Sequence, residues 1–423
     1  MDCITSRRLG ALVFAIIPGF LEITSAAPTS FPSASTTVAS SSTTGLPTTA
    51  AYFVDGTTTS FAHTTLTATG TNEGVIIVKE TGVAYVSDCT LIKAGNTTAE
   101  EDSSFTDLNA AVGIETDGTI YITNSKIITN GIGANGLHTY EDGTTAYLSK
   151  VQIHAEGDYS HGIYTGGGTI YGTDLTVNTF DDHGSAIATD QGGGLIVVKD
   201  TVANTYGALS ALVYSTGNIT ATSLSGVSDI APVACIDGSN SFTLHNPSVA
   251  SGTQNNGVFQ VVSTVASNGT IDTAYAYVTG GSVAETNGTY SVLFVANIQA
   301  YVYFTAVDIT TKSGILANIT ADNDFGTSGV NGGTVDLFLT DLNISGDIFV
   351  DDISVANIYL VGSHWSGAIN PLNSTGTVFV SVDADSTWTL TGDSNVDTID
   401  MKGKGSNVHR GQYDLNYGRK TRG

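Results

Sequence analysis

The chain is short of positive charge. Its 423 residues include 14 Lys and Arg against 39 Asp and Glu, which gives a formal net charge of −25, and no Arg occurs between Arg8 and Arg410. Nucleic acids and anionic lipid surfaces are bound through basic patches, so we expect neither as a partner. An acidic surface also repels a polymer of uronic acids. We therefore expect a carbohydrate or a cell-wall surface as the partner, and neutral glycans as the substrates if the protein is an enzyme.

Cysteine and proline are also scarce, with 3 and 7 residues. Cys3 falls in the predicted signal segment described below, which leaves Cys89 and Cys235, so a small disulfide-rich scaffold is excluded. Charged residues make up 13% of the chain and hydrophobic residues 41%, with 49 Gly. A chain with so many Gly, Thr, Val and Ile residues and so few helix-favouring clusters is predicted to be all-β.

Long apolar runs are missing as well. The 13-residue run Leu9–Leu21 is interrupted by Pro18 and is too short to span a bilayer comfortably. It follows Arg7 and Arg8 and precedes the small residues of 24–26. This order predicts a secretory signal at 1–26 and a secreted protein that resides outside the cell or in the cell wall. The C-terminus has no hydrophobic tail, so we expect no lipid or membrane anchor.

The next part of the chain has the composition of a glycosylated stalk. Residues 28–50 contain 13 Ser or Thr in 23 positions, and we predict a disordered, O-glycosylated linker or stalk over 27–70. Seven Asn-x-Ser/Thr sequons predict N-glycosylation farther on. Their asparagines are Asn96, Asn218, Asn268, Asn287, Asn318, Asn343 and Asn373. Together with the signal, they favour an extracellular glycoprotein.

An internal repeat is the main fold signal. Similar units begin at Gly113, Gly136, Gly162 and Ala186, and weaker copies begin at 211, 234 and 257, in steps of 23 to 26 residues. Alternating runs such as Thr119–Thr123 within each unit are typical of strands. A unit of about 24 residues accommodates three short strands and three turns, which is one coil of a solenoid.

We therefore predict a right-handed parallel β-helix of roughly a dozen coils over 71–400, followed by a basic tail at 401–423. A β-sandwich gives no reason for this repeat, and a propeller blade needs about 40–45 residues. Stacking predicts one inward column of Ile114, Leu137, Ile163 and Ile187 and a neighbouring column of Thr116, Thr139, Thr165 and Thr189. Cys89 and Cys235 would lie too far apart to pair. The insertion at 94–107 is predicted to be a polar loop.

Several Gly- and Asp-rich motifs carry a family resemblance: GIGANG at 131–136, TDQGGG at 189–194, GTSGVNGGT at 326–334, GDIFVDDIS at 346–354 and STWTLTGDS at 386–394. Over 74–400 the chain resembles secreted right-handed parallel β-helix repeat proteins of bacteria and fungi. That group is adhesin-like and has no settled function. The resemblance implies the fold and brings no catalytic motif.

Stacking predicts one cluster with possible chemistry. Equivalent corners of neighbouring units carry the candidate catalytic residues Asp158, His161, Asp181, Asp182 and His183, and His138 and Tyr164 fall nearby. Paired carboxylates can serve glycoside hydrolysis, and a His beside an Asp can act as a general base or a weak metal site. The competing interpretation is that these Asp side chains cap turns. No zinc spacing appears and no metal or cofactor is predicted, although the many carboxylates leave Ca²⁺ open.

These observations favour a secreted, glycosylated β-helix that acts as a cell-wall or surface binding or adhesion module. The alternatives are a carbohydrate-active enzyme of the hydrolase, lyase or epimerase type acting on neutral glycans through the Asp/His cluster, and a scaffold for a small-molecule reaction that needs no acid or base. The missing basic residues weigh against lyases and pectin hydrolases, which handle anionic sugars with Arg or Lys.

Overall fold

The computed structural model describes residues 49–190, 193–264, 271–325, 329–403 and 407–418. The predicted signal at 1–26, the stalk up to residue 48 and the sequon at Asn268 lie outside these ranges.

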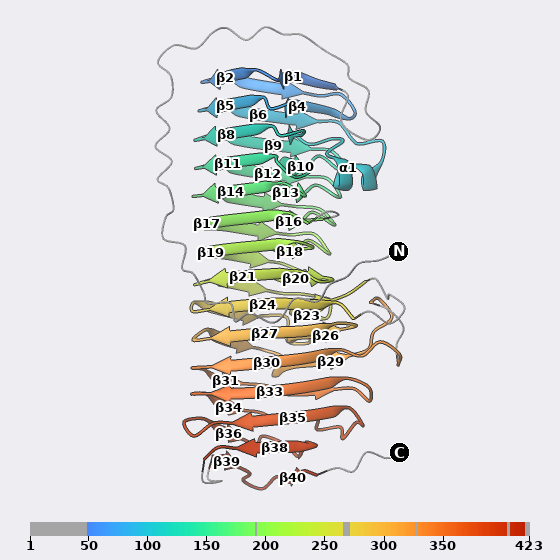
Figure 1. Cartoon of the computed structure of the whole chain (residues 1–423), viewed down its shortest axis with the longest axis vertical. Helices are drawn as coiled ribbons and strands as arrows, with labels where there is room; N and C mark the ends of the chain where they lie inside the picture. Colours follow the sequence, from blue (N-terminus) through green and yellow to red (C-terminus); the bar gives the residue numbers. More distant parts are fainter. Residues whose placement is uncertain (1–48, 191–192, 265–270, 326–328, 404–406, 419–423) are drawn as a thin grey trace, which may run out of the picture. The chain divides into compact units, whose positions relative to one another are not determined.

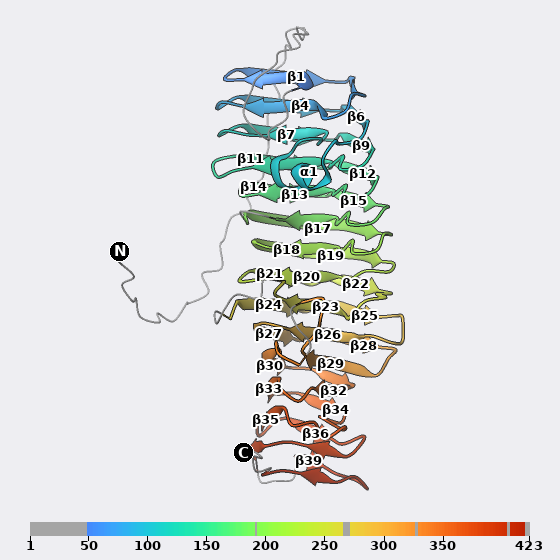
Figure 2. The same ribbon diagram turned by 90° about the vertical axis from the view of Figure 1, so that its right-hand side faces the viewer.

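The described chain winds as a parallel β-helix of about 14 coils, with α1 (Glu100–Thr106) beside the early coils (Figure 1). Each coil contributes strands to three faces (Figures 1 and 2). All strand pairings between successive coils are parallel, for example β11 with β14 and β10 with β13. The prediction of a parallel β-helix is therefore confirmed.

The first face is a 12-stranded sheet, sheet A. Its strands are β1 (Thr49–Asp55), β4 (Glu73–Lys79), β7 (Val112–Ile114), β10 (Leu137–Tyr140), β13 (Ile163–Gly166), β16 (Ile187–Thr189), β18 (Val213–Ser215), β20 (Ala234–Asp237), β23 (Gly257–Val262), β26 (Ser291–Ala296), β29 (Ile315–Thr320) and β32 (Asp347–Val350).

The other two faces belong mainly to a 22-stranded sheet, sheet B. Its second-face strands are β2 (Thr58–Ala62), β5 (Val83–Ser87), β8 (Thr119–Thr123), β11 (Thr145–Ser149), β14 (Thr169–Thr173), β21 (Ser241–His245), β24 (Thr273–Thr279), β27 (Gln299–Thr305), β30 (Thr334–Thr340), β33 (Val355–Val361), β35 (Thr377–Val382) and β38 (Thr398–Met401). Its third-face strands are β3 (Thr65–Ala68), β6 (Thr90–Ala94), β9 (Lys126–Asn130), β12 (Gln152–Glu156), β15 (Thr176–Thr179), β22 (Ser248–Ser251), β25 (Ser282–Glu285) and β28 (Asp308–Thr311). The long strands β17 (Leu195–Thr205) and β19 (Asn218–Ser228) run across both faces.

Two small sheets continue the pattern in the last coils. One contains β31 (Asn343–Ser345), β34 (His364–Ser366), β36 (Thr387–Thr389) and β39 (Val408–His409), and the other contains β37 (Ser394–Asn395) and β40 (Leu415–Asn416).

The core is a set of apolar columns inside the coils. Leu137 pairs in register with Ile163, and Ile163 with Ile187, as predicted, and all three are fully buried. One member of the predicted column is wrong: Ile114 pairs with Thr139, and Val112 occupies the place beside Leu137. The predicted Thr column is wrong at the same coil, because Ile114 takes the place assigned to Thr116. A shift of two residues keeps the same face of a strand, so the core remains apolar.

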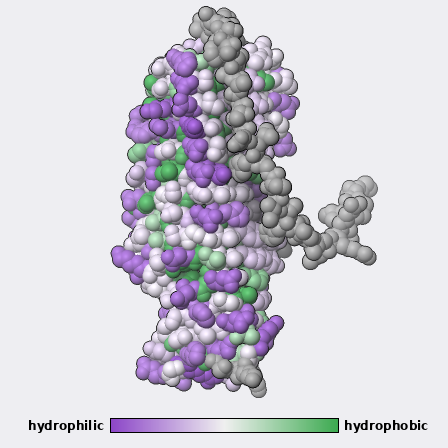
Figure 3. All heavy atoms as spheres, turned by 90° about the vertical axis from the view of Figure 1, so that its left-hand side faces the viewer, coloured by the Kyte–Doolittle hydropathy of each residue, from purple (hydrophilic) through white to green (hydrophobic). Residues whose placement is uncertain are grey.

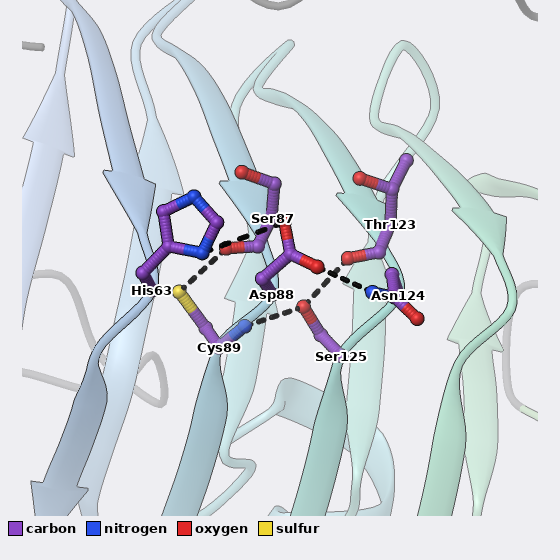
Figure 4. A network of polar contacts seen from close by, with 7 residues as sticks. All are labelled: His63, Ser87, Asp88, Cys89, Thr123, Asn124 and Ser125. Atoms are coloured by element: carbon purple, nitrogen blue, oxygen red, sulfur yellow. Dashed lines mark hydrogen bonds and ion pairs between the residues drawn. The ribbon is translucent and has the colours of Figure 1, made fainter.

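The turn between the second and third faces is made by one residue in the left-handed conformation. His63, Asp88 and Asn124 hold equivalent places with φ of 52°, 52° and 46°, and Figure 4 shows them side by side with their neighbours. Asn124 donates a hydrogen bond to Asp88, and Ser125 Oγ accepts one from the Cys89 N–H at 3.0 Å. Asp and Asn tolerate this conformation better than most residues, which explains their recurrence at the turn.

The β-helix begins and ends beyond the expected boundaries. The first coil, β1 to β3, lies inside the range assigned to the stalk, and Phe61 and Leu66 of this coil are buried. The Thr-rich composition misled the assignment, because Thr is also common in strands. At the other end, β39 and β40 lie inside the range assigned to a basic tail.

Both cysteines of the described chain are free thiols. Cys89 is buried in the turn, with its Sγ 3.2 Å from the Ser87 carbonyl oxygen, whereas Cys235 lies in β20 and is half-buried. Burial raises the pKa of both thiols. Because the thiolate is the reactive form, we expect both to react slowly with a disulfide reagent in the native protein and rapidly after denaturation. Fast labelling of Cys89 in the native state would contradict this placement.

Candidate functional site

The predicted catalytic carboxylates lie at exposed turns. Asp158, Asp181 and Asp182 are exposed. Asp181 Oδ2 accepts a hydrogen bond from the Gly157 N–H at 2.7 Å, and Asp182 Oδ1 accepts one from Ala208 at 2.7 Å. Both bonds join neighbouring coils. The geometry thus gives Asp181 and Asp182 a capping role in the stack, and catalysis by them stays a prediction.

The two histidines of the predicted cluster have different surroundings. His183 is half-buried with φ of 58°, and its ring stacks on Tyr159 with centroids 4.5 Å apart. His161 is buried, and its Nδ1 accepts a hydrogen bond from the Ser185 N–H at 3.0 Å. Burial lowers the pKa of His161 to about 4, so its ring is neutral at pH 7. The five predicted residues gather at one corner without forming one exposed constellation.

A single row of side chains points outward from sheet A along many coils, and we call it the outer row. The pairing register sets its members in successive strands. They are Ile77, Gly113, His138, Tyr164, Ala188, Tyr214, Cys235, Gln260, Phe294, Asn318 and Phe349. The predicted equivalence of His138 and Tyr164 is confirmed by this register. The outer row divides into a closed part in the early coils and an open part in the late coils.

The closed part lies beneath the insertion that carries α1. The sequence predicted a polar loop here, but the insertion contains a short helix and ends in buried residues such as Asp107 and Asn109. Ser103 Oγ donates to the Gly133 carbonyl oxygen at 2.5 Å, which ties α1 to the neighbouring coil. A Cβ at Gly113 would lie 2.1 Å from Asp107 Oδ2, so only glycine fits beneath this carboxyl group.

Buried ionisable groups meet under the insertion. Asp107 Oδ1 lies 3.5 Å from His138 Nδ1, the His138 ring lies 4.5 Å from the Tyr164 ring, and His161 stacks on Tyr164 at 4.6 Å. Burial raises the pKa of Asp107 well above its usual range and lowers that of His138 to about 3. The His138 ring is therefore neutral at pH 7. Asp107, His138 and Tyr164 are each 0–1% exposed, so this cluster is closed to a ligand from solution.

Aromatic ladders cover parts of sheet B. Tyr85, Tyr121, Tyr147 and Tyr171 stack in one ladder with centroid distances of 5.1, 4.8 and 5.4 Å. A second ladder starts at Tyr277 and continues through the next coils. Within a ladder, each ring stacks face to face on its neighbours, which leaves mainly ring edges in contact with solvent. The ladders therefore stabilise the stacking of coils and offer few free ring faces to a sugar.

The open part of the outer row forms the floor of a cleft of about 520 Å³ on sheet A. Its floor is Phe294, Asn318 and Phe349, which are adjacent through the register of β26, β29 and β32. Phe294 packs against Phe325 and is only 2% exposed, so Asn318 and the half-buried Phe349 are the accessible part of the floor. The rim includes Tyr290, Asp322, Asn370 and the 80% exposed Leu372. None of the described residues lining this cleft is basic.

The sequence marks Asn318 only as a sequon and does not reveal the cleft. The repeat blurs beyond residue 276, and the floor residues are separated by 24 and then 31 residues. The sequence signal for this floor is the alternation along β26. Leu293 and Val295 point into the core, and Phe294 between them points outward.

The described surface mixes hydrophilic and apolar residues. On the face shown in Figure 3, hydrophilic residues are scattered among residues of intermediate hydropathy, and apolar residues gather in places. Within the described ranges, no group of three or more His, Cys, Asp or Glu side chains is placed to hold a metal ion. No helix in those ranges is both long and apolar enough to cross a membrane.

Comparison of the chain with protein-family models, with curated proteins and with solved structures finds no match.

Proposed function

We propose that the protein is a secreted binding module of a cell wall or extracellular surface, and that it holds a neutral glycan in the cleft on sheet A. The observation that carries the proposal is the floor of the cleft, where Asn318 lies between Phe294 and Phe349. The apolar C–H face of a sugar ring packs well against a phenyl ring. A carboxamide beside it both donates and accepts hydrogen bonds to hydroxyl groups.

The charge of the chain supports the neutral class of ligand. A formal net charge of −25 repels anionic polysaccharides, and the described lining of the cleft supplies no cation to bind a carboxylate or sulfate group. The predicted signal, stalk and sequons place such a module outside the cell. The accessible part of the floor, from Asn318 to Phe349, spans one strand spacing, about 4.8 Å, which suits contact with a single sugar ring of an oligosaccharide.

Retention on insoluble neutral polysaccharides tests this proposal. We expect the chain made in a bacterial host, without N-glycans, to be retained, and Phe349→Ala to weaken binding about tenfold because an aromatic contact worth about 1.4 kcal/mol is lost. Phe349 is half-buried, so its truncation should leave the fold intact. Phe379→Ala is the matched control, since Phe379 is a half-buried phenylalanine on β35, in sheet B. Equal loss in both variants would contradict the cleft as the site.

The same preparation separates binding from catalysis. Release of soluble sugars from any tested glycan, abolished by Asp182→Asn, would overturn the binding proposal in favour of a carbohydrate-active enzyme. Retention without release of product supports it. Because Asp182 Oδ1 accepts a backbone hydrogen bond that the Asn oxygen can also accept, the substitution tests charge and proton transfer with little change in the turn.

A further inference from the structure

Three of the sequons meet at the cleft. Asn318 lies in its floor, Asn287 begins a sequon whose Thr289 lines the cleft, and Asn373 follows the lining residue Leu372. The other described sequons, at Asn96, Asn218 and Asn343, have exposed asparagines that are not among the cleft's lining residues. The cleft is therefore the place on the described surface where attached glycans would gather.

Asn318 is the one among these three whose side chain belongs to the floor. It points outward from β29, because Ala317 and Ile319 on either side of it are buried in the core. No hydrogen bond joins its carboxamide to another residue in the described ranges. By contrast, Nδ2 of Asn287 donates a hydrogen bond to the Gly252 carbonyl oxygen at 3.4 Å. Nδ2 of Asn318 is thus free to carry a substituent that extends into the cleft.

The neighbours of Asn318 suit a sugar attached to it. Phe294 and Phe349 occupy the same register position on the two adjacent strands, so they lie about 4.8 Å to either side along the stack. The first sugar linked to Nδ2 would therefore lie beside the half-buried ring of Phe349 and cover the part of that ring which contacts water, whereas Phe294 is already only 2% exposed. The volume of about 520 Å³ leaves room for such a group.

We infer that in part of the secreted chains Asn318 carries an N-linked glycan that occupies the cleft, and that the cleft accepts an external glycan only in the chains unmodified at this residue. In the attachment step, a bond forms between Nδ2 and the anomeric carbon of a lipid-diphosphate-linked oligosaccharide. The bond from that carbon to the diphosphate breaks, Nδ2 loses one proton, and the lipid diphosphate leaves with the electron pair. The regulatory half of this inference rests on the proposed function, and the occupancy of the cleft does not.

Two substitutions at the third sequon position give a matched pair. Thr320→Ala removes the sequon and Thr320→Ser keeps it, while Asn318 and both phenylalanines stay in place. The sequons at Asn287 and Asn373 remain in both variants, so a difference between the variants is specific to Asn318. Each variant and the unchanged chain are secreted from a eukaryotic host. The unchanged chain and Thr320→Ala are also made in bacteria as forms without glycans, because Thr320 itself lines the cleft.

Glycopeptide mass spectrometry should find a glycan on Asn318 in the secreted chain and in Thr320→Ser. Hydroxyl-radical oxidation of Phe349 should fall several-fold in these two proteins relative to Thr320→Ala, with oxidation of Phe379 unchanged. Retention on neutral polysaccharide should be at least tenfold weaker for the modified chains of these two proteins than for their forms without glycans, and secreted Thr320→Ala should bind like Thr320→Ala made in bacteria.

Unmodified Asn318 in the secreted chain, or modified Asn318 without protection of Phe349, would overturn the inference. Modified and unmodified chains that bind equally well would overturn its regulatory half. If the bacterial chain binds no neutral glycan, the proposed function fails, whereas the mass and oxidation measurements still decide whether the glycan of Asn318 occupies the cleft.

Discussion

Replacing Trp388 with alanine is expected to lower the free energy of unfolding of the late coils by about 3 to 5 kcal/mol. Trp388 is fully buried, and its ring stacks on Trp365 with centroids 5.1 Å apart. Its Nε1–H donates to the Gly367 carbonyl oxygen at 2.9 Å, so the truncation also leaves a buried carbonyl oxygen without this donor. Chemical denaturation followed by the far-ultraviolet circular dichroism of the backbone measures this loss of stability.

The loss should be local, because each coil of a solenoid contacts only its neighbours. We expect faster amide hydrogen exchange from β31 onward and unchanged exchange in β8 to β15. Trp388→Phe should recover part of the stability, since it keeps the ring contact and loses only the hydrogen bond. Uniformly faster exchange along the whole chain would contradict the stacked arrangement.

Acidification should destabilise the protein through His161. In the folded state the pKa of His161 is about 4, lowered by burial, whereas an unfolded histidine titrates near 6.5. Between these two values the unfolded chain takes up a proton that the folded chain does not. Stability from this residue is therefore complete above pH 6.5 and is lost as the pH falls, by up to about 1.4 kcal/mol per pH unit.

Other buried groups also change the pH dependence of the free energy of unfolding, some with the same sign as His161 and some with the opposite sign. His138 acts with the same sign as His161, because burial lowers its pKa to about 3. Asp107 and Glu115 act with the opposite sign, because burial raises the pKa of Asp107 and raises that of Glu115 to about 7, so the folded state gains protons there on acidification. A comparison between two chains that differ only at His161 cancels these contributions.

His161→Asn supplies that comparison. An Asn oxygen can accept the hydrogen bond that Nδ1 now accepts from the Ser185 N–H, and the amide does not titrate. The stability difference between the unchanged chain and the variant should shift by about 2 to 3 kcal/mol in favour of the variant from pH 6.5 to pH 4.5. Urea denaturation at several pH values measures it. Parallel stability curves would show that His161 is not held neutral in the folded protein.

The fold was predictable because the residues that point into the core recur at a regular spacing. Leu137, Ile163 and Ile187 recur at steps of 26 and 24 residues, and the structure aligns them in register. The same pattern failed at Ile114 because the insertion before it removed the local spacing from which the register of that coil could be read. A two-residue error is invisible to the alternation of a strand, since both positions face the core.

The functional prediction was limited by side-chain direction and by the irregular late coils. Asp181 and Asp182 were placed at the correct corner, but a sequence does not show that each carboxylate accepts a backbone hydrogen bond from the next coil. Asp107 was treated as part of a polar loop, although it is fully buried against His138. In the sequence Phe349 stands out only as part of a motif of the resemblance, and the register that sets it beside Asn318 contains a shift.

Distances between paired spin labels along one exposed column test the central claim most directly. Lys126, Gln152, Val202 and Asp308 occupy equivalent third-face positions, and Asp308 lies four, six and seven strands beyond Val202, Gln152 and Lys126. With one label at Asp308→Cys and the second at each of the other three positions, in a chain lacking its native cysteines, the stack predicts distances of about 19, 29 and 34 Å. Distances that do not increase in proportion to the number of coils would contradict a chain wound about one axis.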